Sequence, residues 1–152
     1  MTIAPIVRSV YTKASPHRAF NIFTNSIGSW WPKGRGIGAR PLASMVIEPF
    51  EGGRWYECDS EGEETQWGRV LTWAPPSLLM LAWQIDANMT YDPDLVTEVE
   101  LVFEPAETGG TTVTLTHRNL ERFGQNTEKL VESIGKGWSQ MVDLFAQSAD
   151  EE

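Results

Sequence analysis

The sequence has little of the residues that build disulfides and metal centres. Of its 152 residues, one is cysteine and two are histidine. The single thiol, Cys58, cannot form an intramolecular disulfide, and a lone thiol is typical of a protein in a reducing cytosol. No cluster of His, Cys and carboxylates has the spacing of a metal site. We therefore expect no metal, no other cofactor and a cytoplasmic location.

Long apolar runs and an excess of positive charge are also missing. No run approaches the ~20 apolar residues that span a bilayer, and the first residues lack the charged and apolar regions of a signal peptide. Twelve Lys and Arg residues stand against 21 Asp and Glu, for a formal net charge of −9. Such a surface repels phosphate backbones and anionic membranes. We expect no nucleic-acid partner and no membrane insertion.

Familiar catalytic and phosphate-binding motifs are absent. There is no Gly-x-Ser-x-Gly nucleophile turn. Residues 33–40 are basic and rich in glycine, but they lack the pattern and the strand-to-helix setting of a phosphate-binding loop. We interpret this segment as a mobile loop.

Tryptophan, by contrast, is abundant. Seven occur in the chain: Trp30, Trp31, Trp55, Trp67, Trp73, Trp83 and Trp138. An indole is large and mostly apolar, with one N–H that needs a partner when buried. So many indoles indicate either a bulky core or a cavity lined by flat aromatic surfaces.

The order of elements predicts one α+β domain over residues 1–152. Ser15 and Pro16 mark the start of a helix over 17–25, and a second short helix spans 27–31. Strands are expected at 6–13, 43–48, 54–58, 65–73, 78–84, 96–103 and 111–117. Their short connections favour an antiparallel meander, with Trp67, Arg69, Leu71 and Trp73 on its inner face.

A long amphipathic helix is expected over residues 127–147. Its apolar positions recur at steps of three and four: Leu130, Ile134, Trp138, Met141 and Phe145. Gly135 and Gly137 each weaken the helix by up to ~1 kcal/mol, so we expect close approach to a strand or room for a ligand there. The sheet should curl around this helix and bury its apolar face.

Several short motifs resemble, in order, the family of proteins similar to activator of Hsp90 ATPase homologue 1, within the START/Bet v 1-like superfamily. They are an opening strand followed by Ala-Ser-Pro, the Trp30-Trp31-Pro32 element, Glu48-Pro49 with Gly52-Gly53, Gly68-Arg69-Val70-Leu71 with Pro75-Pro76, Gly109-Gly110-Thr111, and Gly137-Trp138. The resemblance implies a helix-grip fold of about six to seven strands, with a hydrophobic cavity between the sheet and the last helix. It implies no particular activity.

We therefore predict binding of a small apolar or aromatic molecule in that cavity. The predicted ligand-binding residues are Trp31, Trp55, Trp67, Arg69, Leu71, Trp73, Leu81, Trp83, Tyr91, His117, Trp138 and Met141. A cyclase or hydrolase acting in the same cavity, or a module that binds a chaperone or another protein, are the alternatives. The sequence leaves open whether the protein is a monomer or a homodimer, and it predicts no catalytic residue.

Several of these side chains have two interpretations each. His117 is either a ligand contact and general base or a structural hydrogen-bonding group at a strand end. Arg69 either meets an anionic ligand or extends to the rim, and its possible partners Glu57 and Asp86 are otherwise surface residues. We expect Trp30 and Trp31 to point different ways, with the pair closing one end of the pocket.

Overall fold

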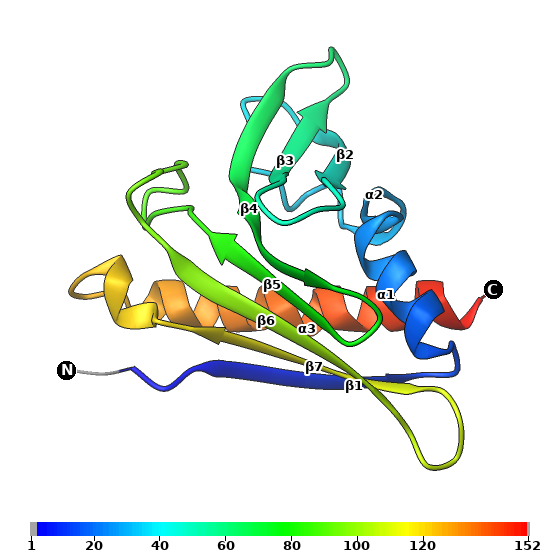
Figure 1. The fold of residues 1–152 in the computed structure, drawn as a ribbon. Coiled ribbons are helices and arrows are strands. Elements are labelled where there is room, and N and C mark those ends of the chain that lie inside the picture. The colour runs from blue at the N-terminus through cyan, green and yellow to red at the C-terminus, as the bar shows by residue number, and fades with distance from the viewer. Residues whose placement is uncertain (1–2, 152) are drawn as a thin grey trace.

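The computed structural model describes residues 3–151, which form one curved sheet gripping a long helix (Figure 1). The strands are β1 (Ile6–Thr12), β2 (Leu42–Ile47), β3 (Arg54–Asp59), β4 (Glu64–Ala74), β5 (Leu78–Trp83), β6 (Thr97–Pro105) and β7 (Thr111–Arg118). The helices are α1 (Pro16–Thr24), α2 (Ile27–Trp30), the 3-10 turn η1 (Leu120–Phe123) and α3 (Glu128–Asp150). The predicted α+β helix-grip fold is confirmed, and η1 is the element that the sequence did not indicate.

The described residues form a seven-stranded antiparallel sheet in the order β1-β7-β6-β5-β4-β3-β2. Strands β2 to β7 follow one another as the expected meander, whereas β1 joins the end beside β7. The β2–β3 hairpin and the start of β4 curl away from the plane of the other strands (Figure 1). This curl creates the concave side on which the helices pack.

Local sequence explains why α1 starts and where it packs. The hydroxyl of Ser15 accepts a hydrogen bond from the backbone N–H of Arg18 at 3.3 Å, and Pro16 occupies the first helical turn. Phe20 and Phe23 are buried, and both pack against Phe103 of β6. Helix α1 thus covers one end of the sheet (Figure 1).

Both glycines of α3 lie beside an arginine from another segment, and Gly135 shows the close approach of a strand that its place in the helix predicts. A Cβ at Gly135 would lie 2.9 Å from Nη2 of Arg8, which donates to the carbonyl oxygen of Gly135 at 3.2 Å. A Cβ at Gly137 would lie 3.4 Å from Nη1 of Arg35. The glycines therefore let one arginine from β1 and one from residues 31–41 lie against the helix.

Two irregularities in β4 overturn the predicted inner face of that strand. The register shifts once opposite Trp55 and Tyr56 and again between Val70 and Thr72. Each shift adds a residue to β4 and reverses which side chains face the core. Trp67 and Trp73 keep the predicted direction, but Val70 replaces Leu71 in the core.

Arg69 consequently faces the outer side of the sheet. Cross-strand partners point to the same face of the sheet, and Arg69 pairs with Ala82, which pairs with Glu98. Ala82 is next to Trp83 along β5, so these three residues point to the face opposite Trp83. The Arg69 guanidinium donates to the side-chain oxygen of Gln84 at 3.1 Å. The predicted inward position of Arg69 is therefore wrong, because one strand bulge precedes it.

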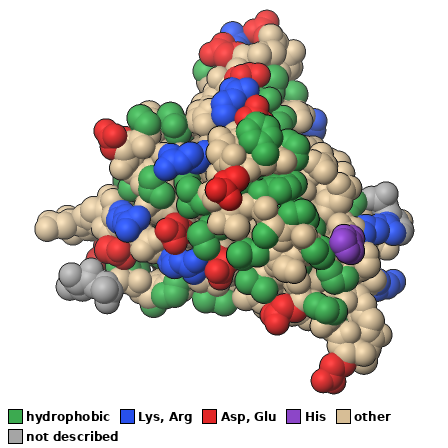
Figure 2. Space-filling view, in the orientation of Figure 1, with side chains coloured by type: hydrophobic (Ala, Val, Ile, Leu, Met, Phe, Trp, Pro, Cys, Tyr) green, Lys and Arg blue, Asp and Glu red, His purple; other side chains and the backbone are tan. Residues whose placement is uncertain are grey.

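The surface is mixed in charge. On the face shown in Figure 2, acidic and basic side chains are interspersed among apolar ones, without a continuous basic area. Within residues 3–151, no helix is both long and apolar enough to cross a membrane.

Candidate functional site: an aromatic box with two unpaired indole N–H groups

Five indoles meet between the sheet and α3, and we call this group the aromatic box. Its members are Trp31, Trp55, Trp67, Trp83 and Trp138, each at most 5% exposed. Each comes from a different part of the fold: the end of α2, the strands β3, β4 and β5, and α3. The sheet supplies three of them because the bulge beside Trp55 lets Trp67 point inward next to Gly68.

Trp31 contacts three of the other four indoles of the box. Its ring centroid lies 6.1 Å from that of Trp55, 5.4 Å from Trp67 and 6.2 Å from Trp138, and all three contacts are edge-to-face. Its neighbour Trp30 is buried too, 5.8 Å away, and packs on Phe145. The sequence predicts that the pair closes one end of a pocket; in the structure the Trp31 ring contacts both the sheet and the helix.

Two of the box indoles have buried N–H groups without a hydrogen-bond partner. They are Nε1 of Trp55, which is 0% exposed, and Nε1 of Trp83. The other indole N–H groups nearby are satisfied: Trp67 donates to Glu57, Trp138 to His117, and Trp31 to the carbonyl oxygen of Arg35. Buried donors are nearly always paired in folded proteins, so two unpaired ones on neighbouring rings, whose centroids lie 5.9 Å apart, call for an explanation.

His117 is enclosed in a complete hydrogen-bond chain beside the box. Trp138 Nε1–H donates to His117 Nδ1 at 3.1 Å, which assigns the ring proton to Nε2. That N–H donates to Thr97 Oγ1 at 2.8 Å, and the Thr97 hydroxyl donates to the carbonyl oxygen of Trp83. Burial lowers the pKa of His117 to about 3, so the ring is neutral. With both nitrogens engaged, the geometry matches the structural interpretation of this residue.

Glu57 is a buried carboxylate that the sequence analysis placed on the surface. It is 1% exposed, and its Oε1 accepts from Trp67 Nε1 at 2.7 Å and from the backbone N–H of Ile37 at 2.6 Å. Oε2 accepts from the N–H of Gly38 at 3.2 Å. Alternation along β3 was the available signal, because Glu57 lies two residues after Trp55 and so shares its face.

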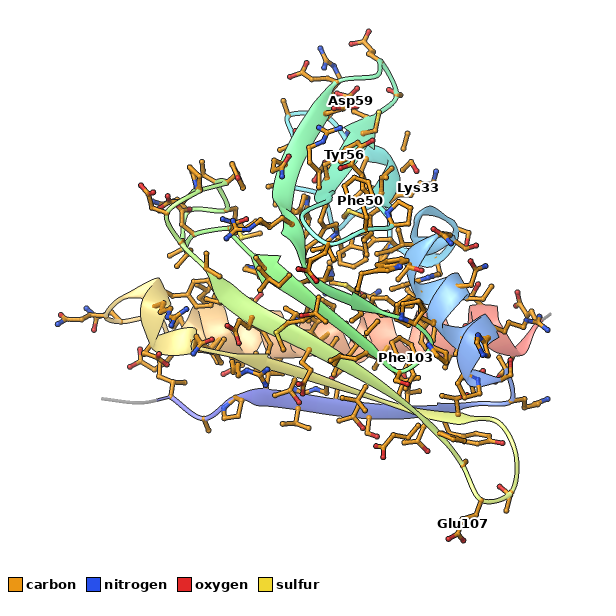
Figure 3. The ribbon with its side chains drawn as sticks, in the orientation of Figure 1. Lys33, Phe50, Tyr56, Asp59, Phe103 and Glu107 are labelled. Carbon is orange, nitrogen blue, oxygen red and sulfur yellow. The ribbon has the colours of Figure 1, made fainter. Side chains whose placement is uncertain are left out.

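The glycine-rich segment, residues 31–41, covers this carboxylate. A Cβ at Gly36 would lie 2.7 Å from Glu57 Oε2, so glycine is needed for the close approach. The segment also reaches α3, where Arg35 Nε donates to Gln140 Oε1 at 3.1 Å. In this structure the expected mobile loop is therefore docked on both β3 and α3. Figure 3 marks Lys33 in this segment, beside β2, and Tyr56 and Asp59 on the neighbouring hairpin.

The structure brings together most, but not all, of the predicted ligand-binding residues. Eight belong to the buried core on the concave side or lie against it: Trp31, Trp55, Trp67, Leu81, Trp83, His117, Trp138 and Met141. Trp73 packs against Phe20 of α1. Arg69 lies on the outer face, Leu71 is half-buried outside the core, and Tyr91 lies in the loop after β5, bridged to Ile85.

Two hollows stand out on the surface, and neither is lined by tryptophan. One, of about 480 Å³, lies between the α1–α2 region and β2; the other, of about 560 Å³, lies between β1 and α3. Within residues 3–151, no three His, Cys, Asp or Glu side chains are grouped to hold a metal ion. The aromatic box, with Glu57 and the two unpaired N–H groups, is therefore our candidate site.

Solved structures with the same architecture span the whole chain. The anthrahydroquino-γ-pyrone synthase Txn09, complexed with SUM, is 35% identical over 96% of this chain and 97% of its own, with a TM-score of 0.67. CalC, a self-sacrificing resistance protein from Micromonospora echinospora, is 30% identical over 97% and 95%, with a TM-score of 0.71. The Aha1 dimer from Colwellia psychrerythraea shares the fold at 17% identity over 97% of both chains, with a TM-score of 0.69.

None of the curated proteins compared with this chain matches it. A family model does, and it covers residues 13–150, from the end of β1 to the end of α3. The strand order, the gripped helix and this match agree: the chain belongs to the family of Activator of Hsp90 ATPase homolog 1-like proteins.

Proposed function

We propose that the protein binds a small, planar, apolar or aromatic molecule between the sheet and α3, at the aromatic box. The observation that carries this proposal is the pair of buried, unpaired N–H groups of Trp55 and Trp83. An unpaired buried donor costs about 1–3 kcal/mol, and a ligand with an acceptor atom removes that cost. Flat indole faces favour a flat partner.

Two solved structures at 30% identity or more support this proposal. One is a γ-pyrone synthase and the other a self-sacrificing resistance protein. A γ-pyrone is a flat ring that carries a carbonyl acceptor. The ligand proposed for this chain is therefore a planar aromatic molecule with at least one carbonyl oxygen.

Binding of chromone, a bicyclic aromatic ketone, tests the proposal. Isothermal titration should show binding of chromone, with weaker binding of naphthalene, which has the rings but no acceptor, and of dodecanoate, which is flexible. Trp55→Phe and Trp83→Phe keep an aromatic ring but remove the N–H, and each should weaken chromone binding by roughly 5- to 10-fold, the value of one hydrogen bond.

Trp30→Phe is the matched control, because the N–H of Trp30 is already bonded to the carbonyl oxygen of Ile22 at 2.9 Å. This variant should keep the wild-type affinity for chromone. Equal affinities for chromone, naphthalene and dodecanoate, or no binding at all, would count against the proposal.

A second candidate function is catalysis of a ring closure, favoured by the buried carboxylate of Glu57 and the 35% identical synthase. A carboxylate held away from water beside a bound aromatic substrate can act as a general base. His117 is less suited, since both of its nitrogens are engaged and burial lowers its pKa to about 3.

The ring closure of 2′-hydroxychalcone to flavanone, in which a base removes the phenolic proton, tests this second candidate. Wild type should accelerate the reaction, and Glu57→Gln should lose most of the acceleration while chromone still binds. Acceleration that is unchanged in Glu57→Gln would exclude Glu57 as the base.

A further inference from the structure

The ring of Trp31 fills the position that the proposed ligand needs. It touches β3 through Trp55, β4 through Trp67 and α3 through Trp138, each edge-to-face. These three indoles are the surfaces that would enclose a flat molecule between the sheet and the helix. An indole-sized planar molecule can therefore enter the box when Trp31 leaves it.

Trp31 belongs to the segment that covers Glu57. Its Nε1 donates to the carbonyl oxygen of Arg35 at 3.2 Å, and Arg35 N–H donates to the carbonyl oxygen of Pro32 at 3.0 Å. Two residues on, the N–H groups of Ile37 and Gly38 donate to Glu57. The indole is thus tied to residues 32–35, and Ile37 and Gly38 follow directly in the same short segment. We treat Trp31 and residues 32–38 as one unit.

Few bonds hold this unit to the rest of the protein. Among the described residues, the backbone-to-backbone hydrogen bonds of residues 32–41 include no bond to a strand of the sheet. The unit is held by side-chain contacts: Glu57 on β3, Gln140 on α3 and the bond of Lys33 Nζ to the carbonyl oxygen of Ala43. The Trp31 ring adds its three aromatic contacts, and Arg40, just beyond the unit, pairs with Asp59, Glu61 and Glu63. None of these contacts is a backbone-to-backbone hydrogen bond. A segment with few such bonds is the part of a fold that opens at low free-energy cost.

Expulsion of the unit would expose groups that can form hydrogen bonds with a ligand. The Glu57 carboxylate would lose its two backbone donors and keep Trp67, so it could accept from a hydroxyl of the ligand. Trp55 and Trp83 offer their free N–H groups to a carbonyl. The box without Trp31 therefore suits a planar aromatic molecule that carries a carbonyl, a hydroxyl, or both.

We propose that Trp31 is a displaceable internal plug: a planar aromatic ligand of about the size of its indole binds by expelling it, together with residues 32–38. This inference rests on the proposed function and names how that site opens. The free protein must open before it binds, so the apparent affinity is lower than that of the open box.

Hydrogen exchange of the wild-type protein with chromone tests the plug. A ligand normally protects amides near its site. Expulsion instead frees the N–H groups of Ile37 and Gly38 from Glu57, so chromone should make these two amides exchange roughly tenfold faster or more, because exchange follows the open population. Amides of α3 next to Trp138 should exchange more slowly.

Substitution of the plug is the second measurement. Trp31→Ala removes the cost of opening and should bind chromone at least ~10-fold more tightly than wild type. Trp30→Ala, which empties a neighbouring core position instead, should bind it no more tightly than wild type. If Trp31→Ala does not fold, Trp31→Phe, with a smaller ring, should show the same direction of change.

The outcomes separate this inference from the proposed function. If neither wild type nor the Trp31 variants bind chromone, the proposed function fails. If wild type binds chromone while Ile37 and Gly38 become protected and Trp31→Ala binds more weakly, the function stands and the plug is wrong. If Trp31→Ala binds and wild type does not, the ring is a fixed part of the core and the plug is also wrong.

Discussion

His117 couples the stability of this protein to pH. Burial lowers its pKa from 6.5 to about 3 in the folded chain, so below pH 6.5 the unfolded chain binds a proton that the folded chain does not. Folding therefore loses stability as pH falls from about 6.5 toward 3, at up to about 1.4 kcal/mol per pH unit. We expect a loss of roughly 2 kcal/mol between pH 7 and pH 5, measured by urea denaturation.

His117→Gln separates this effect from the titration of the carboxylates. The Gln side chain can accept from Trp138 and donate to Thr97, but it does not titrate. The variant should be less stable at pH 7 because the packing changes, yet its stability should fall by less between pH 7 and pH 5. The same loss in both proteins would contradict the assignment to His117.

Single polar residues were the part of the site that sequence reasoning predicted least well. The interior position of His117 follows from strand alternation, and its two interpretations could be separated only by the partners Thr97 and Trp138, which come from other elements. Glu57 could have been placed inside by alternation with Trp55. It was assigned to the surface because burying a carboxylate is costly unless several donors surround it, and two of its three donors are backbone groups of a distant loop.

At the level of elements, β4 shows that strict alternation of side chains between the two faces of a strand does not predict bulges. Its bounds were predicted to within a residue, but its two register shifts were not. Arg69 was therefore placed on the wrong face, and Leu71 was placed in the core, which it does not enter. Gly68 was the available signal. A glycine inside a strand often marks a bulge or a close approach of another backbone.

Gly68→Ala should disturb this element. A Cβ at Gly68 would overlap the carbonyl oxygen of Ala82 on β5, and the backbone must shift to make room. Overpacking of this kind costs about 1–3 kcal/mol, so we expect a matching decrease in the free energy of unfolding. Because Trp55 and Trp83 both pair with Gly68, chromone binding should weaken as well.

Gly34→Ala is the matched control within residues 31–41. A Cβ at Gly34 meets nothing within 4 Å, and its φ is not in the left-handed region. This variant should keep the stability of wild type or gain a few tenths of a kcal/mol, since alanine restricts the unfolded chain. A similar loss of stability in Gly34→Ala and Gly68→Ala would show that the close approach of β4 and β5 is not the cause.

At the scale of the whole molecule, the fold was largely predictable. The order of strand, helix and turn signals and the resemblance they carry led to the helix-grip architecture, which the family match and the strand order confirm. The pairing of β1 with β7 was not predicted, because it joins segments as far apart in the chain as Ile6 and His117. Trp31 was predicted among the pocket residues, but its contacts with both the sheet and α3 were not, since they depend on how residues 31–41 dock on both layers.

The contact that joins the first strand to the end of the last helix carries a prediction at this same scale. Asp150, at the end of α3, accepts from the Thr12 hydroxyl at 2.7 Å and from the backbone N–H of Lys13 at 2.8 Å. These two hydrogen bonds lower the pKa of Asp150, so its contribution to stability is present above the unfolded value near 3.8 and is lost as pH falls through the lower folded pKa. Asp150→Asn should lower the melting temperature at pH 7 by a few degrees at most, because the carboxylate is exposed and water competes for it.

Asp143→Asn changes an exposed carboxylate two turns earlier on the same helix and should leave the melting temperature unchanged. Equal effects of the two variants would mean that the net charge of α3, and not the closure of β1 onto α3, sets the change. As pH falls through the lowered pKa of Asp150, the carboxyl becomes uncharged like the amide that replaces it, so the difference in melting temperature between wild type and Asp150→Asn should shrink.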